Sequence, residues 1–375
     1  MHLSLHELCE RCAIRLMAHL RVLLENTDIV SVNSYVSYMA TNDMIDNAMA
    51  KGVISSDTAN ALKEYNQRLV QNDYPIIYNL RHLRKILSIR KNEQDKFFGR
   101  NRNQYHTFFI PKKSGGKRKI EAPSDRLKSF QLWIKEQILD NIHISDHAKG
   151  FKKSSSIIDN AKEHVGKDLV INVDIKDFFP SITYKQVFRI FVYIGYTTEV
   201  AHLLTQICTN NKNVLPQGSP ASPSISNIVS LRLDKRLDGL AKKYDCCYTR
   251  YADDITFSGK TNIKNMMPFI EYIIFDEGFK INQEKVRLQY KNQRQEVTGL
   301  IVNQKISVSP KLQREISNAI YYCKKFGVES HMQRIGCLRS FYKEHLYGIA
   351  YFIKMIDEQK GSYYLNQLDQ ICWSY

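Results

Sequence analysis

The chain has 375 residues, 43% hydrophobic and 25% charged, which is enough to bury a sizeable core in two or three domains. Lysine and arginine number 54 against 38 acidic residues, and the resulting net charge of +16 favours a polyanionic partner such as nucleic acid. No apolar run approaches the eighteen or so residues of a membrane span, and eight scattered cysteines suit reduced thiols. We therefore expect a cytoplasmic protein that does not bind membranes.

Residues 1 to 70 predict a helical extension, because leucines recur at helical spacing and glycine is rare. Four residues near the start have a spacing that resembles a set of zinc ligands: His2, His6, Cys9 and Cys12. No second paired-ligand cluster follows them, so packing on an amphipathic helix is favoured over a metal site.

A hairpin is expected from residue 105 to residue 123. Residues 105–111 read as a strand, residues 112–117 form a glycine turn with several cations, and residues 118–123 return as a second strand. An amphipathic helix follows, with apolar positions from Leu127 to Ile138.

Two acidic elements stand out further along the chain. Residues 169–174 form an apolar, β-branched run that predicts a buried strand ending on Asp174, where an unpaired charge would be costly. Residues 247–258 form two alternating strands around Asp253-Asp254, and aspartate tolerates the positive φ that a two-residue hairpin demands.

A divalent cation shared by Asp174, Asp253 and Asp254 would explain both elements. Nucleotidyl transfer needs two hard cations about 3.5–4 Å apart, bridged by carboxylates, to activate a 3′-hydroxyl and steady the pyrophosphate leaving group. Each aspartate alone would more simply cap a strand or lie in a solvated turn, but the set of three favours a metal site.

Between these elements lies a proline-spaced turn over residues 215–223. Its Gly218 lets the backbone approach a ligand closely, and Gln217 offers an amide to a nucleotide. Ser222-Pro223 predicts the start of a helix that reaches about Tyr244. Further helix and strand patterns up to residue 302 complete an α+β arrangement, and from Lys311 the chain is again helical.

The Asp174 block, the Gln217-Gly218 turn and the hairpin at Asp253 occur in the order of the palm motifs of reverse transcriptases. The cationic hairpin around Arg118 and the later stretch of residues 278–285 flank them. Over about residues 75 to 305 the sequence therefore resembles a reverse transcriptase. The resemblance implies a right-hand polymerase fold, with an N-terminal helical extension over 1–70, fingers over 71–170, a palm over 171–305 and a helical, RNA-binding thumb over 306–375.

The resemblance also implies roles for the matching residues. Asp174 and Asp253 would be the principal metal ligands and Asp254 the third carboxylate, holding two Mg²⁺ ions, with deoxynucleoside triphosphates as substrates. Residues implied in nucleotide binding are Arg118, Lys112, Lys113, Phe179, Gln217 and Lys285. Arg118 and a neighbouring lysine would grip the triphosphate, because guanidinium geometry suits phosphate oxygens. Lys285 would donate a proton to pyrophosphate.

Phe179 aligns with the position that walls off the 2′ side of the sugar. A bulky aromatic there would clash with a ribonucleotide 2′-hydroxyl, which predicts a preference for deoxynucleotides. The alternative is a core aromatic beside Phe178.

Two more motifs resemble signatures of bacterial retron reverse transcriptases. Residues 160–164 match Asn-Ala-x-x-His, and residues 297–299 match Val-Thr-Gly. In retron enzymes, the segment after the second motif recognises a structured non-coding RNA. The stretch from Lys311 alternates cations with aromatics, which suits phosphates and looped-out bases, although a helical thumb with core aromatics would give a similar pattern. Residues implied in RNA binding are Asn160, His164, Lys311, Arg314, Lys324, Lys325, Arg334 and Arg339.

The sequence thus predicts an RNA-directed DNA polymerase of a retron. It would copy part of a cognate non-coding RNA into single-stranded DNA, primed by a 2′-hydroxyl of that RNA, and serve anti-phage defence beside a separate effector protein. Two alternatives are another bacterial reverse transcriptase, intron-like or of another defence type, and a catalytically silent RNA-binding scaffold. The intact aspartates argue against the scaffold, and Phe179 argues against an RNA-synthesising polymerase.

Overall fold

The computed structural model describes residues 34–99, 102, 104–111, 115–337 and 339–373. It divides into two compact units, and the chain passes between them three times. The first unit holds the described residues up to Ser145 together with Asp177–Arg232, and the second holds Asp146–Lys176 and the chain from Leu233 onward. Each unit is therefore assembled from separate stretches of the sequence.

Some predicted features lie outside the described residues. They are the first part of the helical extension, over residues 1–33, and the side chains of His2, His6, Cys9, Cys12, Lys112 and Lys113. Among the helices that are described, none has the length and apolar character needed to cross a membrane.

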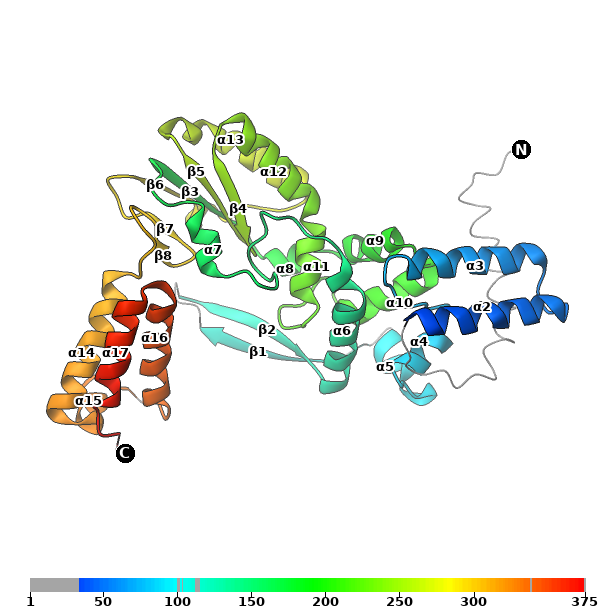
Figure 1. Cartoon of the computed structure of the whole chain (residues 1–375), viewed down its shortest axis with the longest axis horizontal. Coiled ribbons are helices and arrows are strands. Elements are labelled where there is room, and N and C mark those ends of the chain that lie inside the picture. The colour runs from blue at the N-terminus through cyan, green and yellow to red at the C-terminus, as the bar shows by residue number, and fades with distance from the viewer. Residues whose placement is uncertain (1–33, 100–101, 103, 112–114, 338, 374–375) are drawn as a thin grey trace. The chain divides into compact units, whose positions relative to one another are not determined.

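The first unit is mainly helical and carries one two-stranded sheet (Figure 1). Strand β1 (Tyr105–Pro111) pairs antiparallel with β2 (Lys117–Pro123), which confirms the predicted hairpin. Helices α2 (Ser34–Ala50) and α3 (Ser56–Val70) form the described part of the helical extension. The other helices of this unit are α4 (Leu80–Ile86), η2 (Lys91–Glu93), α5 (Gln94–Phe98), α6 (Asp125–Gln137), η3 (Leu139–Asn141), α8 (Phe178–Ser181), α9 (Tyr184–Ile194), α10 (Thr198–Cys208) and α11 (Ser222–Val229).

Polar side chains determine where several of these helices begin. Ser55 caps α3, Asn79 caps α4 and Ser124 caps α6, each accepting a hydrogen bond from a backbone N–H of the first turn. Helix α11 starts differently from the prediction, because Ser222 is its first residue rather than its cap. The Ser222 hydroxyl instead donates to the carbonyl of Pro216 at 2.8 Å and closes the preceding turn.

A four-stranded antiparallel sheet forms the centre of the second unit, in the order β4-β5-β3-β6. Its strands are β3 (Leu169–Asp174), β4 (Cys247–Tyr251), β5 (Asp254–Gly259) and β6 (Arg287–Tyr290). A separate small hairpin is formed by β7 (Glu296–Val297) and β8 (Leu300–Ile301). The helices are α7 (Ile157–Lys162), α12 (Leu231–Lys243), which begins at the unit boundary after a break at Ser230, η4 (Thr261–Met266), α13 (Met267–Asp276), η5 (Gln283–Lys285), α14 (Pro310–Phe326), α15 (Val328–Arg334), α16 (Tyr342–Ile356) and α17 (Glu358–Asp369).

The two faces of this sheet differ in chemistry, since successive strand residues point to opposite sides. On one face, Tyr248 stacks on Phe257 with ring centroids 5.0 Å apart, and its hydroxyl donates to Asp234 of α12 at 2.7 Å. On the other face, Thr249 is hydrogen-bonded to His164, which follows α7. Helices α12 and α7 therefore cover opposite faces of the sheet.

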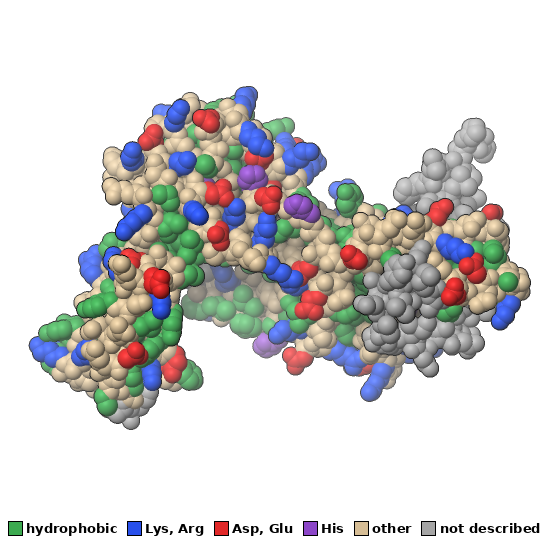
Figure 2. All heavy atoms as spheres, in the orientation of Figure 1, with side chains coloured by type: hydrophobic (Ala, Val, Ile, Leu, Met, Phe, Trp, Pro, Cys, Tyr) green, Lys and Arg blue, Asp and Glu red, His purple; other side chains and the backbone are tan. Residues whose placement is uncertain are grey.

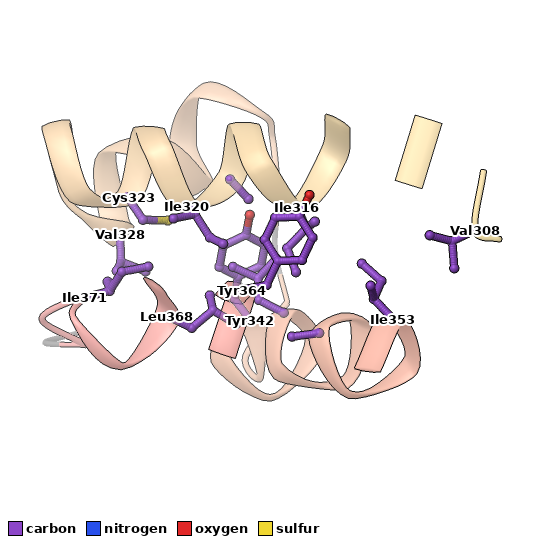
Figure 3. Close-up of a cluster of buried hydrophobic side chains, with 13 residues drawn as sticks. Val308, Ile316, Ile320, Cys323, Val328, Tyr342, Ile353, Tyr364, Leu368 and Ile371 are labelled. Atoms are coloured by element: carbon purple, nitrogen blue, oxygen red, sulfur yellow. The ribbon is translucent and has the colours of Figure 1, made fainter. Parts of the chain in front are cut away.

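The four C-terminal helices surround a hydrophobic core of their own (Figure 3). Ile316 and Ile320 of α14 face Leu368 of α17 and the side chains of Tyr342 and Ile353 from α16. Other side chains of α16 pack against a second apolar cluster beneath α7 and the β7–β8 hairpin. Of the aromatic residues after Lys311 that were predicted to stack on bases, some are exposed, such as Tyr321, but Tyr342 is buried in this core.

Candidate active site

Two of the three predicted carboxylates lie on the hairpin between β4 and β5. Tyr251 pairs with Asp254, which leaves Ala252 and Asp253 as a two-residue turn. Asp174, the last residue of β3, lies directly opposite Asp254. Directly opposed residues of antiparallel strands project from the same face with Cβ atoms about 4.5–5.5 Å apart. The structure therefore brings Asp174 and Asp254 together at the end of the sheet, beside the turn that carries Asp253.

The turn differs from the prediction in which residue carries the strain. The positive φ falls on Ala252, at 59°, and not on an aspartate. A positive φ at the first central position is the pattern of a type II′ turn, where glycine is normal. For an alanine this conformation costs about 1–2 kcal/mol, so contacts around the turn have to hold it.

One such set of contacts comes from residues 147–150, a segment that runs along the outer edge of β4 and is called the strap below. The carbonyl of His147 accepts from the backbone N–H of Arg250 at 2.8 Å, and the carbonyl of Arg250 accepts from the N–H of Lys149 at 2.7 Å. Gly150 lies so close to the turn that a Cβ there would be 2.7 Å from the backbone nitrogen of Ala252. Only glycine fits this position without moving the hairpin.

The carboxylates are electrostatically coupled. Burial and the charges of Asp253 and Asp174 raise the pKa of the Asp254 carboxyl to about 6. A proton therefore competes with a cation for Asp254 as the pH falls through about 6. The charges and the oxygen donors fit a hard divalent ion. In the described part of the chain, no three His, Cys, Asp or Glu side chains are spaced to hold an ion.

Lys285 balances one of these charges. Its ammonium donates to the Asp174 carboxylate at 2.8 Å. Backbone hydrogen bonds fix the segment before it, since Asn282 donates to the carbonyl of Asp174 and Lys176 donates to that of Lys280. A cation bound at Asp174 would compete with Lys285 for the same carboxylate.

Arg118 and Gln217 both lie in the first unit, and β2 connects them. Arg118 is exposed on β2, and the backbone N–H of Glu121 on the same strand donates to the Gln217 carbonyl at 2.9 Å. Gly218 has a φ of 144°, and a Cβ there would lie 2.5 Å from the Glu121 carbonyl oxygen. The close approach that Gly218 permits is thus to β2, within the protein.

Phe179 is partly exposed, unlike its neighbour. Phe178 is buried, and the ring of Phe179 lies beside it, tilted by 48° with ring centroids 5.7 Å apart. The short helix α8 follows Asp177, whose φ is 49°, and the Ser181 hydroxyl donates to the Phe178 carbonyl at 2.7 Å. This turn directs one phenylalanine into the core and leaves part of the other accessible.

Asn160 and His164 do not form an RNA-binding surface, and their prediction as RNA contacts is wrong. Their exposed fractions are 1% and 0%, so neither side chain can reach a bound molecule. The His164 ring bonds the hydroxyls of Ser258 and Thr249, each at 2.7 Å, and thereby joins the segment after α7 to two strands. Burial lowers the pKa of His164 to about 3, so the ring is neutral at physiological pH.

Asn160 instead connects the two motifs that resemble retron signatures. Its amide donates to the Thr298 hydroxyl at 3.4 Å, and that hydroxyl donates to the Ile157 carbonyl at 3.5 Å. Thr298 and Gly299 have φ values of 47° and 84°, the pattern of a type I′ turn between β7 and β8. The two motifs therefore form one structural unit on the carboxylate-bearing face of the sheet.

Comparison with known protein families shows which family the chain belongs to. Residues 110–303 match the family of reverse transcriptases, RNA-dependent DNA polymerases. The chain belongs to this family. The reverse transcriptase is 33% identical to the retron Ec86 reverse transcriptase of Escherichia coli over 297 residues, which cover 78% of this chain and 89% of that protein. Identity is 34% with the retron Mx65 reverse transcriptase of Myxococcus xanthus, over 68% of this chain and 62% of that one, and 32% with the retron Ec83 enzyme of Escherichia coli, over 68% and 87%.

These relatives confirm a retron reverse transcriptase with RNA-directed DNA polymerase activity and the α+β right-hand polymerase fold. Enzymes with this domain use divalent metal ions, which agrees with the like charges gathered around Asp254. The carboxylates of the hairpin are thus the metal-binding candidates of this reverse transcriptase.

The predicted RNA-binding cations of the reverse transcriptase are all exposed. They are Lys311, Arg314, Lys324, Lys325, Arg334 and Arg339. Among the residues that the structure describes, none of the six forms an ion pair with an acidic side chain. Lys325 lies over the rings of Tyr321 and Phe326, and Arg334 lies over Tyr322. On the face shown in Figure 2, cations lie among hydrophobic side chains over these helices.

Replacing His164 tests its structural assignment. His164→Ala leaves the buried hydroxyls of Ser258 and Thr249 without their partner and opens a cavity, so we expect unfolding free energy to fall by about 2–4 kcal/mol in denaturant titration. Affinity of the folded variant for RNA should stay within about twofold. His143→Ala, at an exposed site, is the matched control and should leave stability unchanged. Weaker RNA binding at unchanged stability would contradict the assignment.

Proposed function

We propose that this retron reverse transcriptase copies part of a cognate structured non-coding RNA into single-stranded DNA, starting from a 2′-hydroxyl of that RNA. The observation that carries the proposal is the meeting of Asp174 and Asp254 in register at the end of the sheet, beside the Asp253 turn. It is the arrangement of carboxylates that nucleotidyl transfer requires. The retron relatives support the RNA substrate.

Asp174 and Asp253, with Asp254, are proposed to hold two Mg²⁺ ions. When bound, these ions would activate the attacking hydroxyl and stabilise the pyrophosphate leaving group. The raised pKa of Asp254 agrees with the proposal, because it reflects burial first and then the like charges of Asp253 and Asp174, which a cation would relieve. Lys285 donates a hydrogen bond to Asp174 in the structure. With a cation at that carboxylate, Lys285 is proposed to turn to the pyrophosphate leaving group and donate a proton to it.

Arg118 and Gln217 are proposed to contact the incoming deoxynucleoside triphosphate, Arg118 through its phosphates with help from Lys112 or Lys113. Arg118 is exposed, and no hydrogen bond or ion pair of its side chain is present within the described residues, so its guanidinium is available to an anion. Guanidinium groups suit phosphate oxygens because they donate two parallel hydrogen bonds.

The decisive experiment is to incubate the enzyme with the transcript of its genetic neighbourhood, Mg²⁺ and deoxynucleoside triphosphates. We expect a DNA product that stays attached to RNA and changes mobility after ribonuclease treatment. The Asp253→Asn/Asp254→Asn variant should bind the transcript and make no DNA. DNA without an RNA linkage would favour another type of bacterial reverse transcriptase, and unchanged synthesis by the double variant would refute the metal site.

Phe179 is proposed to exclude ribonucleotides, which agrees with its partial exposure beside the buried Phe178. Phe179→Val should raise ribonucleotide incorporation at least tenfold relative to deoxynucleotide incorporation, measured as the ratio of kcat/KM values in primer extension. Tyr193→Val, at an exposed aromatic of the same unit, should leave that ratio unchanged. An unchanged ratio in Phe179→Val would reduce Phe179 to a packing residue.

RNA recognition is proposed to involve the cations of the C-terminal helices. A cavity of about 540 Å³ between α14 and α17 is bordered by the exposed rings of Tyr321 and Tyr363 and by Lys324 and Lys325. Exposed rings can stack on unpaired bases while neighbouring ammonium groups contact phosphates. Lys324 donates to the side-chain oxygens of Gln367 and Gln370, each at 2.7 Å, and within the described residues it forms no ion pair with an acidic side chain.

Substitution of the two lysines tests this surface. Lys324→Gln/Lys325→Gln should weaken binding of the transcript about tenfold at low salt, and it should reduce the slope of log affinity against log salt by roughly 1.5, as expected for two lost phosphate contacts. Fluorescence anisotropy over a salt range of about 50 to 200 mM measures both quantities. Lys260→Gln/Lys264→Gln removes two exposed lysines elsewhere in the same unit and should change neither.

We further propose that the enzyme acts in the bacterial cytoplasm and serves anti-phage defence together with a separate effector protein. Its support is the similarity to retron enzymes. Phage plating on cells that carry the gene with its neighbours, compared with the Asp253→Asn/Asp254→Asn chain, tests it, and equal plating efficiencies would exclude the defence role.

A further inference from the structure

Arg250 is a charged residue in the interior of the second unit, on β4, two residues before Ala252 of the hairpin turn. Its exposed fraction is 0%, and so is that of its partner Asp234 on α12. Two parallel hydrogen bonds join them, from Nε to Oδ1 and from Nη2 to Oδ2, each at 2.7 Å. The Tyr248 hydroxyl donates to the same Asp234 carboxylate at 2.7 Å.

A third hydrogen bond extends from this ion pair into the turn. The Nη1 of Arg250 donates to the carbonyl oxygen of Ala252 at 3.1 Å. Ala252 is the residue with the strained positive φ, and Asp253 follows it directly. The guanidinium is planar and rigid, so its contacts with Asp234 fix the direction in which Nη1 points at the turn.

Stability alone is a weak explanation for this pair. Removing two charges from water costs several kcal/mol for each ion, and apolar residues of similar volume are often as stable or more so. Burial alone would lower the pKa of Arg250, but the Asp234 carboxylate raises it, so the guanidinium stays charged. What an apolar pair could not supply is a directed donor for the Ala252 carbonyl.

The strap holds the backbone of the same residue. Both the N–H and the carbonyl of Arg250 are hydrogen-bonded to residues 147–149, and Gly150 packs against Ala252. Arg250 is therefore fixed through its main chain at the edge of β4 and through its side chain to α12. The turn is held from both directions.

We propose that Arg250, oriented by Asp234, is a positioning residue that holds the Ala252-Asp253 turn in the geometry in which Asp253 and Asp254 bind metal. This inference rests on the proposed metal-binding role of those two aspartates. Arg250 is fully buried, and it acts through its hydrogen bond to the backbone carbonyl of Ala252.

Arg250→Lys is the direct test, because a lysine keeps the charge and can bond Asp234 but lacks the rigid fork that also reaches Ala252. In DNA synthesis on an RNA template, we expect kcat to fall at least tenfold while the KM for deoxynucleotides stays within about twofold. The Mg²⁺ concentration for half-maximal rate should rise at least threefold, a change that a general loss of stability would not produce.

Arg236→Lys is the matched control. Arg236 lies on α12, the helix that carries Asp234, and it pairs with Asp276 and Glu277 without contacting the hairpin. It should leave kcat and the Mg²⁺ requirement unchanged. A folded Arg250→Lys enzyme with normal kcat and normal Mg²⁺ requirement would overturn the proposal.

Two further variants keep the outcomes distinct. If Arg250→Lys does not fold, Tyr248→Phe removes one hydrogen bond to Asp234 and keeps the ion pair. It should lower kcat two- to fivefold with a raised Mg²⁺ requirement, and no change in either would overturn the proposal.

Asp253→Asn distinguishes failure of the proposed metal site from failure of the positioning role. Full activity in Asp253→Asn would refute the metal site itself, whereas an inactive Asp253→Asn beside a normal Arg250→Lys would refute only the positioning role.

Discussion

The register between β3 and β5 is the constraint on which the site depends. Because side chains alternate along a strand, a shift of one residue would send Asp174 to the face opposite Asp254. Apolar residues on one face do not forbid such a shift by themselves, since β3 is buried on both sides. The register is instead specified by polar side chains that find partners in one alignment only.

Those polar side chains form a line across the carboxylate-bearing face. Gln289 of β6 donates to Asn172 of β3, and Asn172 donates to Thr256 of β5. Further along the same face, His164 bonds Ser258 and the neighbouring strand β4. A slipped register would leave these buried groups without partners, at a cost of about 1–3 kcal/mol for each. The residues that resemble a family signature therefore contribute by fixing the strand alignment beneath the carboxylates.

Sequence reasoning located features that depend on local pattern. A continuous apolar run identified β3, and alternation around two aspartates identified the β4–β5 hairpin. It failed where distant contacts decide the outcome. His164 was assigned to RNA because its motif resembles a retron signature, yet its partners Thr249 and Ser258 lie 85 and 94 residues away along the chain. The positive φ was assigned to aspartate by propensity, but the surroundings impose it on Ala252.

The same limit applies to the supports of the hairpin. The local sequence of residues 147–150 does not predict a strand. These residues pair with β4, which lies about a hundred positions later, and His147 is 101 residues from its hydrogen-bond partner Tyr248. The pairing of Arg250 with Asp234 is likewise invisible to local pattern. The boundaries of fingers, palm and thumb remain predictions, since the two compact units group the chain in a different way.

The strand order has a consequence for how the protein is made. β3 lies between β5 and β6, and both partners follow it on the chain, with Asn172 separated by 84 residues from Thr256 and by 117 from Gln289. On the ribosome, an apolar strand with two open edges is therefore complete long before either neighbour exists. Unpaired edges of this kind invite aggregation, and long-range pairing is slow. Strand β3 is thus a segment of the nascent chain that needs protection from aggregation until β5 and β6 have been made.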